Sequence, residues 1–160
     1  TQDSSEVLSW LSSLYNDQQN FIDAVSTAVN VLNNTTLYQH TAAEQARFNL
    51  ARAYVNLDSI QKAEYLFTQL ISAKQFKLVR LQALSLYAAW RFEKNDFSNS
   101  LLLSKELLLL ADSLQYQNSI TEAHILLIQN YSALKKIKEA ELHLGYAKLS
   151  HANQPGHPFK

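Results

Sequence analysis

Residues 49–54 read Asn-Leu-Ala-Arg-Ala-Tyr, and apolar residues follow at positions 60, 63, 67 and 70. Apolar residues that recur every three or four positions form one face of an α-helix. A short turn at 56–59 interrupts this face and separates two helices. The segment therefore predicts an antiparallel helix pair, in which the small side chain of Ala63 lies where the two helices approach each other closely.

The same arrangement recurs in three other parts of the chain. A small residue marks each copy, and successive marks are 39, 37 and 40 residues apart. The marks are Ala24, Ala63, Ser100 and Ala140. One helix pair cannot bury its own apolar face, whereas stacked pairs can. We therefore expect a single helical-repeat domain over residues 1–150, built from four pairs. The expected pairs span residues 5–38, 44–77, 81–114 and 121–150.

The composition of the 160-residue chain favours an all-α fold. Glycine occurs only at 145 and 156, and proline only at 155 and 158. The tight turns of β-rich domains usually need Gly, Asn-Gly or Pro. Residues 1–144 contain no glycine or proline and are rich in Leu and Ala, which favour helices. The closing segment 151–160 is typical of an extended tail or linker.

The repeated residues resemble the tetratricopeptide repeat (TPR) family. The second copy matches its Leu, small, Tyr, Ala and Phe positions at Leu50, Ala51, Tyr54, Ala63 and Phe67. The fourth copy matches it at Leu127, Tyr131, Ala140 and Ala147. The chain lacks the terminal proline of the family pattern, and its period exceeds the family's roughly 34 residues. The resemblance implies a degenerate, bacterial type of TPR and a right-handed α-α superhelix of about four antiparallel pairs. The alternative is an irregular helical bundle whose apolar stripes imitate repeats.

In this family the first helix of each pair lines a concave face that binds a peptide or another protein. The resemblance assigns this role to seven residues, namely Gln45, Phe48, Arg52, Asn56, Gln82, Phe92 and Gln129. Amide side chains donate and accept hydrogen bonds, which suits the backbone of an extended peptide. The two phenylalanines would supply apolar anchors. The alternative is that the polar residues form only a solvated helix face.

Leucines between residues 101 and 114 surround most of the second helix of the third expected pair. A helix that is apolar nearly all round is buried on more than one side. Either neighbouring helices cover it completely, or part of it is a self-association surface. In the second case Leu102 and Leu109 would meet their own copies in an isologous homodimer.

Charge and motifs exclude several functions. The formal net charge is zero, so no global basic field would hold nucleic acid or an anionic membrane. The longest apolar stretch is far shorter than the roughly 20 residues of a membrane span. The chain has no cysteine and no glycine-rich phosphate loop. Glu139 and His143 share a helix face, but the sequence places no third metal ligand beside them. We therefore expect no catalytic residues, no metal and no cofactor.

Two functions follow from these expectations. The first is a non-enzymatic interaction module that binds a protein or peptide segment on its concave face. The second is a ligand- or partner-sensing input domain of a bacterial signalling or regulatory protein. Such a protein would be a histidine kinase, a cyclic-dinucleotide synthase or a transcription regulator. The sequence is compatible with the cytoplasm, or with the bacterial periplasm as part of a membrane-anchored protein.

Overall fold

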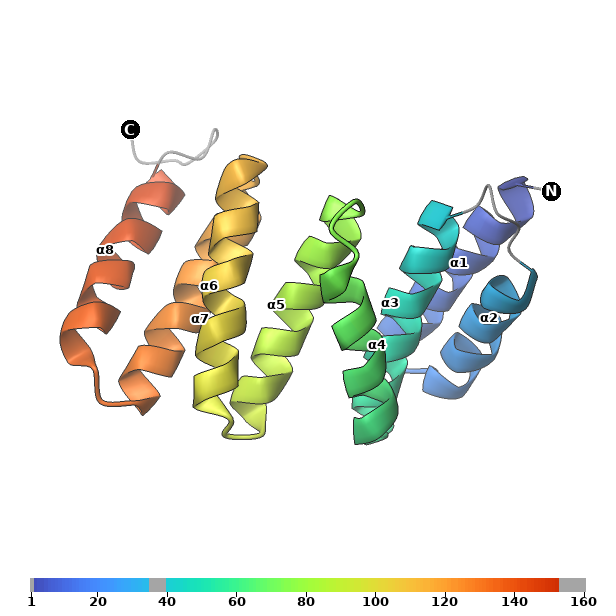
Figure 1. Ribbon diagram of the computed structural model, residues 1–160, viewed down its shortest axis with the longest axis horizontal. Helices are drawn as coiled ribbons and strands as arrows, with labels where there is room; N and C mark the ends of the chain where they lie inside the picture. Colours follow the sequence, from blue (N-terminus) through green and yellow to red (C-terminus); the bar gives the residue numbers. More distant parts are fainter. Residues whose placement is uncertain (1, 35–39, 153–160) are drawn as a thin grey trace. The chain divides into compact units, whose positions relative to one another are not determined.

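The computed structural model describes residues 2–34 and 40–152, in which every regular element is an α-helix (Figure 1). The helices are α1 (Gln2–Asp17), α2 (Phe21–Asn34), α3 (His40–Asn56), α4 (Ile60–Ser72), α5 (Lys77–Glu93), α6 (Phe97–Ser113), α7 (Gln117–Ala133) and α8 (Ile137–Ala152). The all-α class predicted from the composition is confirmed for these residues. The tail was expected from residue 151, whereas α8 continues to Ala152. The rest of the expected tail, 153–160, lies outside the described residues.

The chain divides into two compact units, Thr1–Ala83 and Leu84–Lys160, with the division inside α5. In the first unit, α1 packs against α2 and α3, and α3 also packs against α2 and α4. In the second unit, α7 packs against both α6 and α8. In each unit, the first helix of one pair is therefore packed between the preceding helix and the following helix. This helix is α3 in the first unit and α7 in the second.

Five of the turns between helices share one backbone geometry. Each contains a left-handed residue with φ between 52° and 61°, and these residues are Gln19, Asp58, Asn95, Gln115 and Lys135. The N–H of each left-handed residue donates to the carbonyl three residues earlier, and the next N–H donates to the carbonyl five residues before itself. This pattern is the Schellman C-cap, which satisfies carbonyl groups at a helix end.

The turns within the four helix pairs repeat at the period read from the small residues. Their left-handed residues, Gln19, Asp58, Asn95 and Lys135, are 39, 37 and 40 residues apart. Each stands five residues before the small residue of its copy. The backbone and the side-chain pattern therefore share one repeat, and a position can be compared between pairs by counting from the left-handed residue.

The second helix of each of the first three pairs buries one stripe of residues. The stripe begins at the small residue and continues four and seven positions later, which is one face of a helix. Its members are at most 1% exposed: Ala24, Ala28 and Val31 in α2; Ala63, Phe67 and Leu70 in α4; and Ser100, Ser104 and Leu107 in α6. Because Ala24, Ala63 and Ser100 have small side chains, the two helices of each pair can approach closely at these positions.

The leucine-rich helix α6 is buried on one side and exposed on another. Leu103, Leu107 and Leu110 are buried, whereas Leu102 and Leu109 are exposed. Of the helices in the described part of the chain, none combines the length and the apolarity that crossing a membrane requires.

Candidate binding groove

A groove of about 430 Å³ opens on the first unit. Its lining comes from α1, α3 and the first part of α5, the first helices of three successive pairs. The lining residues are Ser9, Trp10, Ser13, Leu14, Asp17, Gln45 and Gln82. Gln45 and Gln82 each stand thirteen residues before the left-handed residue of their pair. Two of the seven predicted binding residues therefore lie together, at equivalent positions of neighbouring repeats.

Two buried asparagines join the helices beneath this groove. Asn16 Nδ2 donates to the carbonyl oxygen of Asn49 at 3.0 Å, and Asn49 Nδ2 donates to that of Ser9 at 2.7 Å. Buried amides of this kind are costly unless they are hydrogen-bonded, so the pair selects one arrangement of α1 against α3. This arrangement sets the distance between two walls of the groove.

The polar groups of the groove retain hydrogen-bonding capacity. Gln45 Nε2 lies 3.4 Å from Asn49 Oδ1, which is long for a hydrogen bond. The buried hydroxyl of Ser9 has no hydrogen-bond partner among the described residues. Buried polar groups without a protein partner are usually satisfied by water or by a bound molecule. Gln45, whose side chain is partly exposed, is therefore suited to contact a ligand in the groove.

An ion pair joins one lining residue of the groove to α3. Arg52 Nη2 lies 2.7 Å from Asp17 Oδ1, and both side chains are partly exposed. Asn56 Nδ2 donates to the carbonyl oxygen of Arg52 at 2.9 Å. Arg52, which we expected to face a partner directly, is therefore paired with Asp17 of the lining. Exposed pairs of this kind are weak, so a ligand can compete for either partner.

The other predicted binding residues lie elsewhere. Phe48 is half-buried on α3 and is not part of the groove lining. Phe92, in the second unit, packs against Phe97 with ring centroids 5.3 Å apart. Gln129, also in the second unit, is exposed on α7. Phe92 therefore has a packing partner within its own helix pair.

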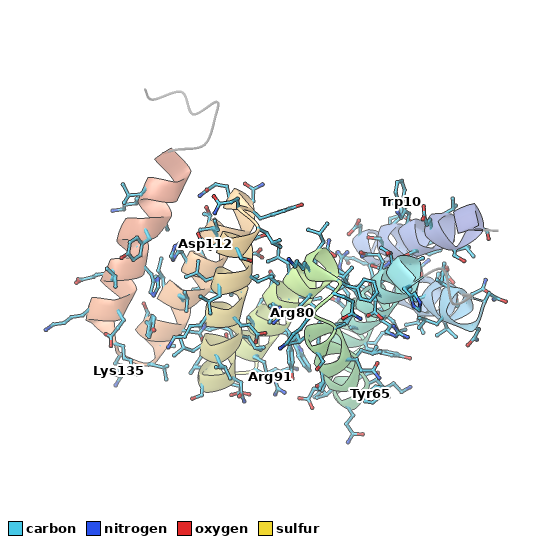
Figure 2. The ribbon with its side chains drawn as sticks, turned by 45° about the horizontal axis from the view of Figure 1, so that its top comes forward. Trp10, Tyr65, Arg80, Arg91, Asp112 and Lys135 are labelled. Carbon is cyan, nitrogen blue, oxygen red and sulfur yellow. The ribbon has the colours of Figure 1, made fainter. Side chains whose placement is uncertain are left out.

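The repeat pattern also places Ser9 and Ser13 on the expected concave face, so the lining residues that sequence reasoning missed are Trp10, Leu14 and Asp17. Trp10 is exposed, and its side chain projects away from α1 (Figure 2). A signal was present, because Val7, Trp10 and Leu14 follow helical spacing on the face of α1 opposite to its buried serines. An apolar row of this kind indicates a contact surface.

Two histidines pair between α7 and α8 in the second unit. The Nδ1 atoms of His124 and His143 are 3.0 Å apart, so one ring donates a proton and the other accepts it. Tyr146 stacks on His124, and Tyr131 stacks on His143. Burial, and then the neighbouring His143, lower the pKa of His124. Burial, and then the charge of Lys105, lower the pKa of His143.

This histidine pair is not part of a larger ligand cluster. Within the described ranges, no group of three or more His, Asp or Glu side chains is placed to hold a metal ion. His143 has His124 and two tyrosine rings as its close neighbours. The two imidazoles are packed against each other and against the rings of Tyr131 and Tyr146.

The exposed leucines of α6 have counterparts on α8. Leu142 and Leu149 stand forty residues after Leu102 and Leu109, at equivalent positions of the next repeat. All four side chains are exposed. Only Leu102 and Leu109 could be recognised from the sequence, because α6 contains seven leucines and α8 contains three.

Comparison of the chain with protein-family models, with curated proteins and with solved structures yields no match.

Proposed function

We propose that the chain is a non-enzymatic, TPR-like module that binds an extended peptide or protein segment in the groove of its first unit. The four helix pairs would stack as a right-handed superhelix, with α1, α3, α5 and α7 along its inner face. Identical Schellman turns at intervals of 39, 37 and 40 residues support this arrangement. Repeating the same turn gives successive pairs the same geometry, which is the basis of a solenoid.

The observation that carries the proposal is the position of Gln45 and Gln82 in one groove with Ser13. Their amide and hydroxyl groups can each donate and accept hydrogen bonds. The backbone of an extended peptide offers the same two kinds of group along its length. Trp10 beside them provides a large amphipathic surface for an apolar side chain of the ligand.

The composition of the lining supports binding rather than catalysis. Asp17 is the one ionisable side chain among the seven lining residues, and it is paired with Arg52. Nucleophilic or acid–base catalysis needs a reactive group within hydrogen-bond reach of a second, orienting group. The hydroxyls of Ser9 and Ser13 have no His, Lys or second carboxylate beside them in this lining.

The test begins with a peptide that is selected from a random library for binding to the wild-type chain. Calorimetry then measures the Kd of this peptide for the wild type and for each variant. The double variant Gln45→Ala, Gln82→Ala should bind this peptide at least about tenfold more weakly, because two partly exposed amides lose their contacts. The matched control replaces Gln61 and Gln69, which are exposed on α4 outside this groove. Equal losses in the two double variants, or none in the groove variant, would refute the proposal.

A further inference from the structure

The first helix exposes three apolar side chains. Val7 is 64% exposed, Trp10 76% and Leu14 49%. They stand twelve, nine and five residues before the left-handed residue Gln19. We call them the α1 row.

The equivalent positions of other first helices are buried. On α3 they are Ala46, Asn49 and Ala53, and on α7 they are Ala123, Leu126 and Asn130. α3 packs against α1 and α2, and α7 packs against α6. Within the chain, these positions are therefore the ones that lie against the preceding helix pair. The α1 row has the apolar character of such a contact and is open to solvent.

The last helix exposes the opposite half of the same contact. Ala28 of α2 and Ser104 of α6 each stand nine residues after the left-handed residue of their pair, and both are fully buried. In these two pairs the second helix packs against the first helix of the next pair, as α2 does against α3 and α6 against α7. The equivalent residue of α8 is Leu144, which is 43% exposed. Three residues further on, Ala147 is only half-buried. α8 therefore presents an uncovered apolar face where earlier pairs receive the next helix.

Gly145 lies beside this face, about 100° around the helix axis from Leu144. Glycine inside a helix is destabilising relative to alanine. A Cβ atom added at Gly145 would have no neighbour within 4 Å, so packing among the described residues does not require the glycine. Its lack of a side chain leaves space beside Leu144 that a bulky group from outside can fill. The indole of Trp10 is such a group.

The charges of the two ends are opposite. α1 contains three acidic residues and no Lys or Arg. Residues 135–152, which include the last turn and α8, contain four lysines and two glutamates. Charge complementarity favours contact between unlike ends over contact between like ends.

We propose that the α1 row of one copy of this chain docks on the exposed face of α8 in a second copy. The contact continues the α2–α3 and α6–α7 packing from one molecule to the next. Exposed apolar rows of this kind favour association with a complementary surface. A head-to-tail contact is heterologous, so each added copy leaves one free face of each kind.

The test uses two variants that each disable one face. Val7→Lys disrupts the α1 row, and Leu144→Lys disrupts the face on α8. Sedimentation velocity over about 10 µM to about 1 mM covers the affinities expected of such contacts. Neither residue lines the groove. Because Trp10 and Leu14 belong to both the groove and the α1 row, peptide binding is measured at protein concentrations at which the wild type is monomeric. Under that condition both variants should bind the selected peptide as the wild type does, so peptide binding and assembly can fail independently.

We expect the wild-type mass to rise with concentration beyond that of a dimer, and each variant to associate at least about tenfold more weakly. An equimolar mixture of the two variants should form a heterodimer and nothing larger, because one intact α1 row meets one intact α8 face. A monomeric wild type, undiminished association of either variant, or a mixture without heterodimer would overturn the proposal. Gly145→Ala gives an independent check, since it should raise the melting temperature and still weaken association. Leu109→Glu should leave association unchanged. If this variant instead fails to associate, the isologous contact through α6 is favoured over the contact between α1 and α8.

Discussion

The hydroxyl of Ser100 donates a 2.8 Å hydrogen bond to the carbonyl oxygen of Ala88 across the third helix pair. In the first pair the equivalent contact runs in the opposite direction, because Ser12 Oγ donates to the carbonyl oxygen of Ala24 at 2.8 Å. Ser12 and Ala88 both stand seven residues before a left-handed residue, and Ala24 and Ser100 both stand five after one. The serine that donates is on the first helix in one pair and on the second helix in the other, but the two contacts join equivalent positions. The two pairs are therefore geometrically equivalent at their closest approach.

Ser100→Ala should lower the free energy of unfolding by about 2 kcal/mol, because the buried hydroxyl makes two hydrogen bonds. It donates to Ala88 and accepts from Asn130 Nδ2 at 2.8 Å. Ser12→Ala removes one bond in an equally buried place and should cost about 1 kcal/mol. Urea unfolding of the two variants measures both values. A larger cost at Ser12 than at Ser100 would contradict this explanation.

Lys135→Gly should stabilise the chain by about 1 kcal/mol, because glycine adopts the left-handed conformation without the steric cost that a side chain imposes. Lys138→Gly is the matched control, since residue 138 lies within α8. The control should lose about 1 kcal/mol through the low helix propensity of glycine. Thermal unfolding of both variants checks the opposite signs, and destabilisation by both would show that the Lys135 side chain has a role of its own.

Arg52→Ala combined with Asn56→Ala should weaken binding of the selected peptide and leave the melting temperature nearly unchanged. Arg52 is partly exposed, and its pairing with Asp17 contributes at most about 1 kcal/mol. Calorimetry and thermal unfolding on the same variant separate the two effects. A fall of many degrees would make these residues structural and remove them from the binding site.

The histidine pair should make the chain less stable in mild acid. The pKa values of His124 and His143 are lowered in the folded chain, whereas an unfolded histidine keeps its ordinary value of 6.5. Below that value the unfolded state binds more protons than the folded state, so stability falls as the pH decreases. Urea unfolding at about pH 7.5 and about pH 5.5 measures the loss on either side of this value.

His124→Gln with His143→Gln is the control for this pH dependence. The double variant should lose less stability than the wild type between the two pH values, because its glutamines do not titrate. An identical pH dependence in both proteins would place its origin in other groups.

The positions of the helix pairs could be predicted from local pattern alone. Helical spacing of apolar residues and the small residues Ala24, Ala63, Ser100 and Ala140 determine where two helices can approach closely. The left-handed turns were harder to foresee. They are occupied by Gln, Asp, Asn and Lys instead of the glycine that usually marks a Schellman cap.

The groove could be predicted only in part, because its shape depends on contacts distant in sequence. Gln45 and Gln82 were identified from their place in the repeat. Trp10 joins them because Asn16 and Asn49, thirty-three residues apart, hold α1 against α3. The partner of Arg52 is thirty-five residues away at Asp17, and no local pattern indicates that pairing.

Nuclear magnetic resonance on the chain, titrated with the selected peptide, tests the central claim most directly. The side-chain amide signals of Gln45 and Gln82 and the indole N–H signal of Trp10 should shift together, in proportion to peptide occupancy. Signals of Gln61 and Gln69 on α4 should stay in place. Shifts confined to α4 or α6, with the groove signals unchanged, would contradict the account.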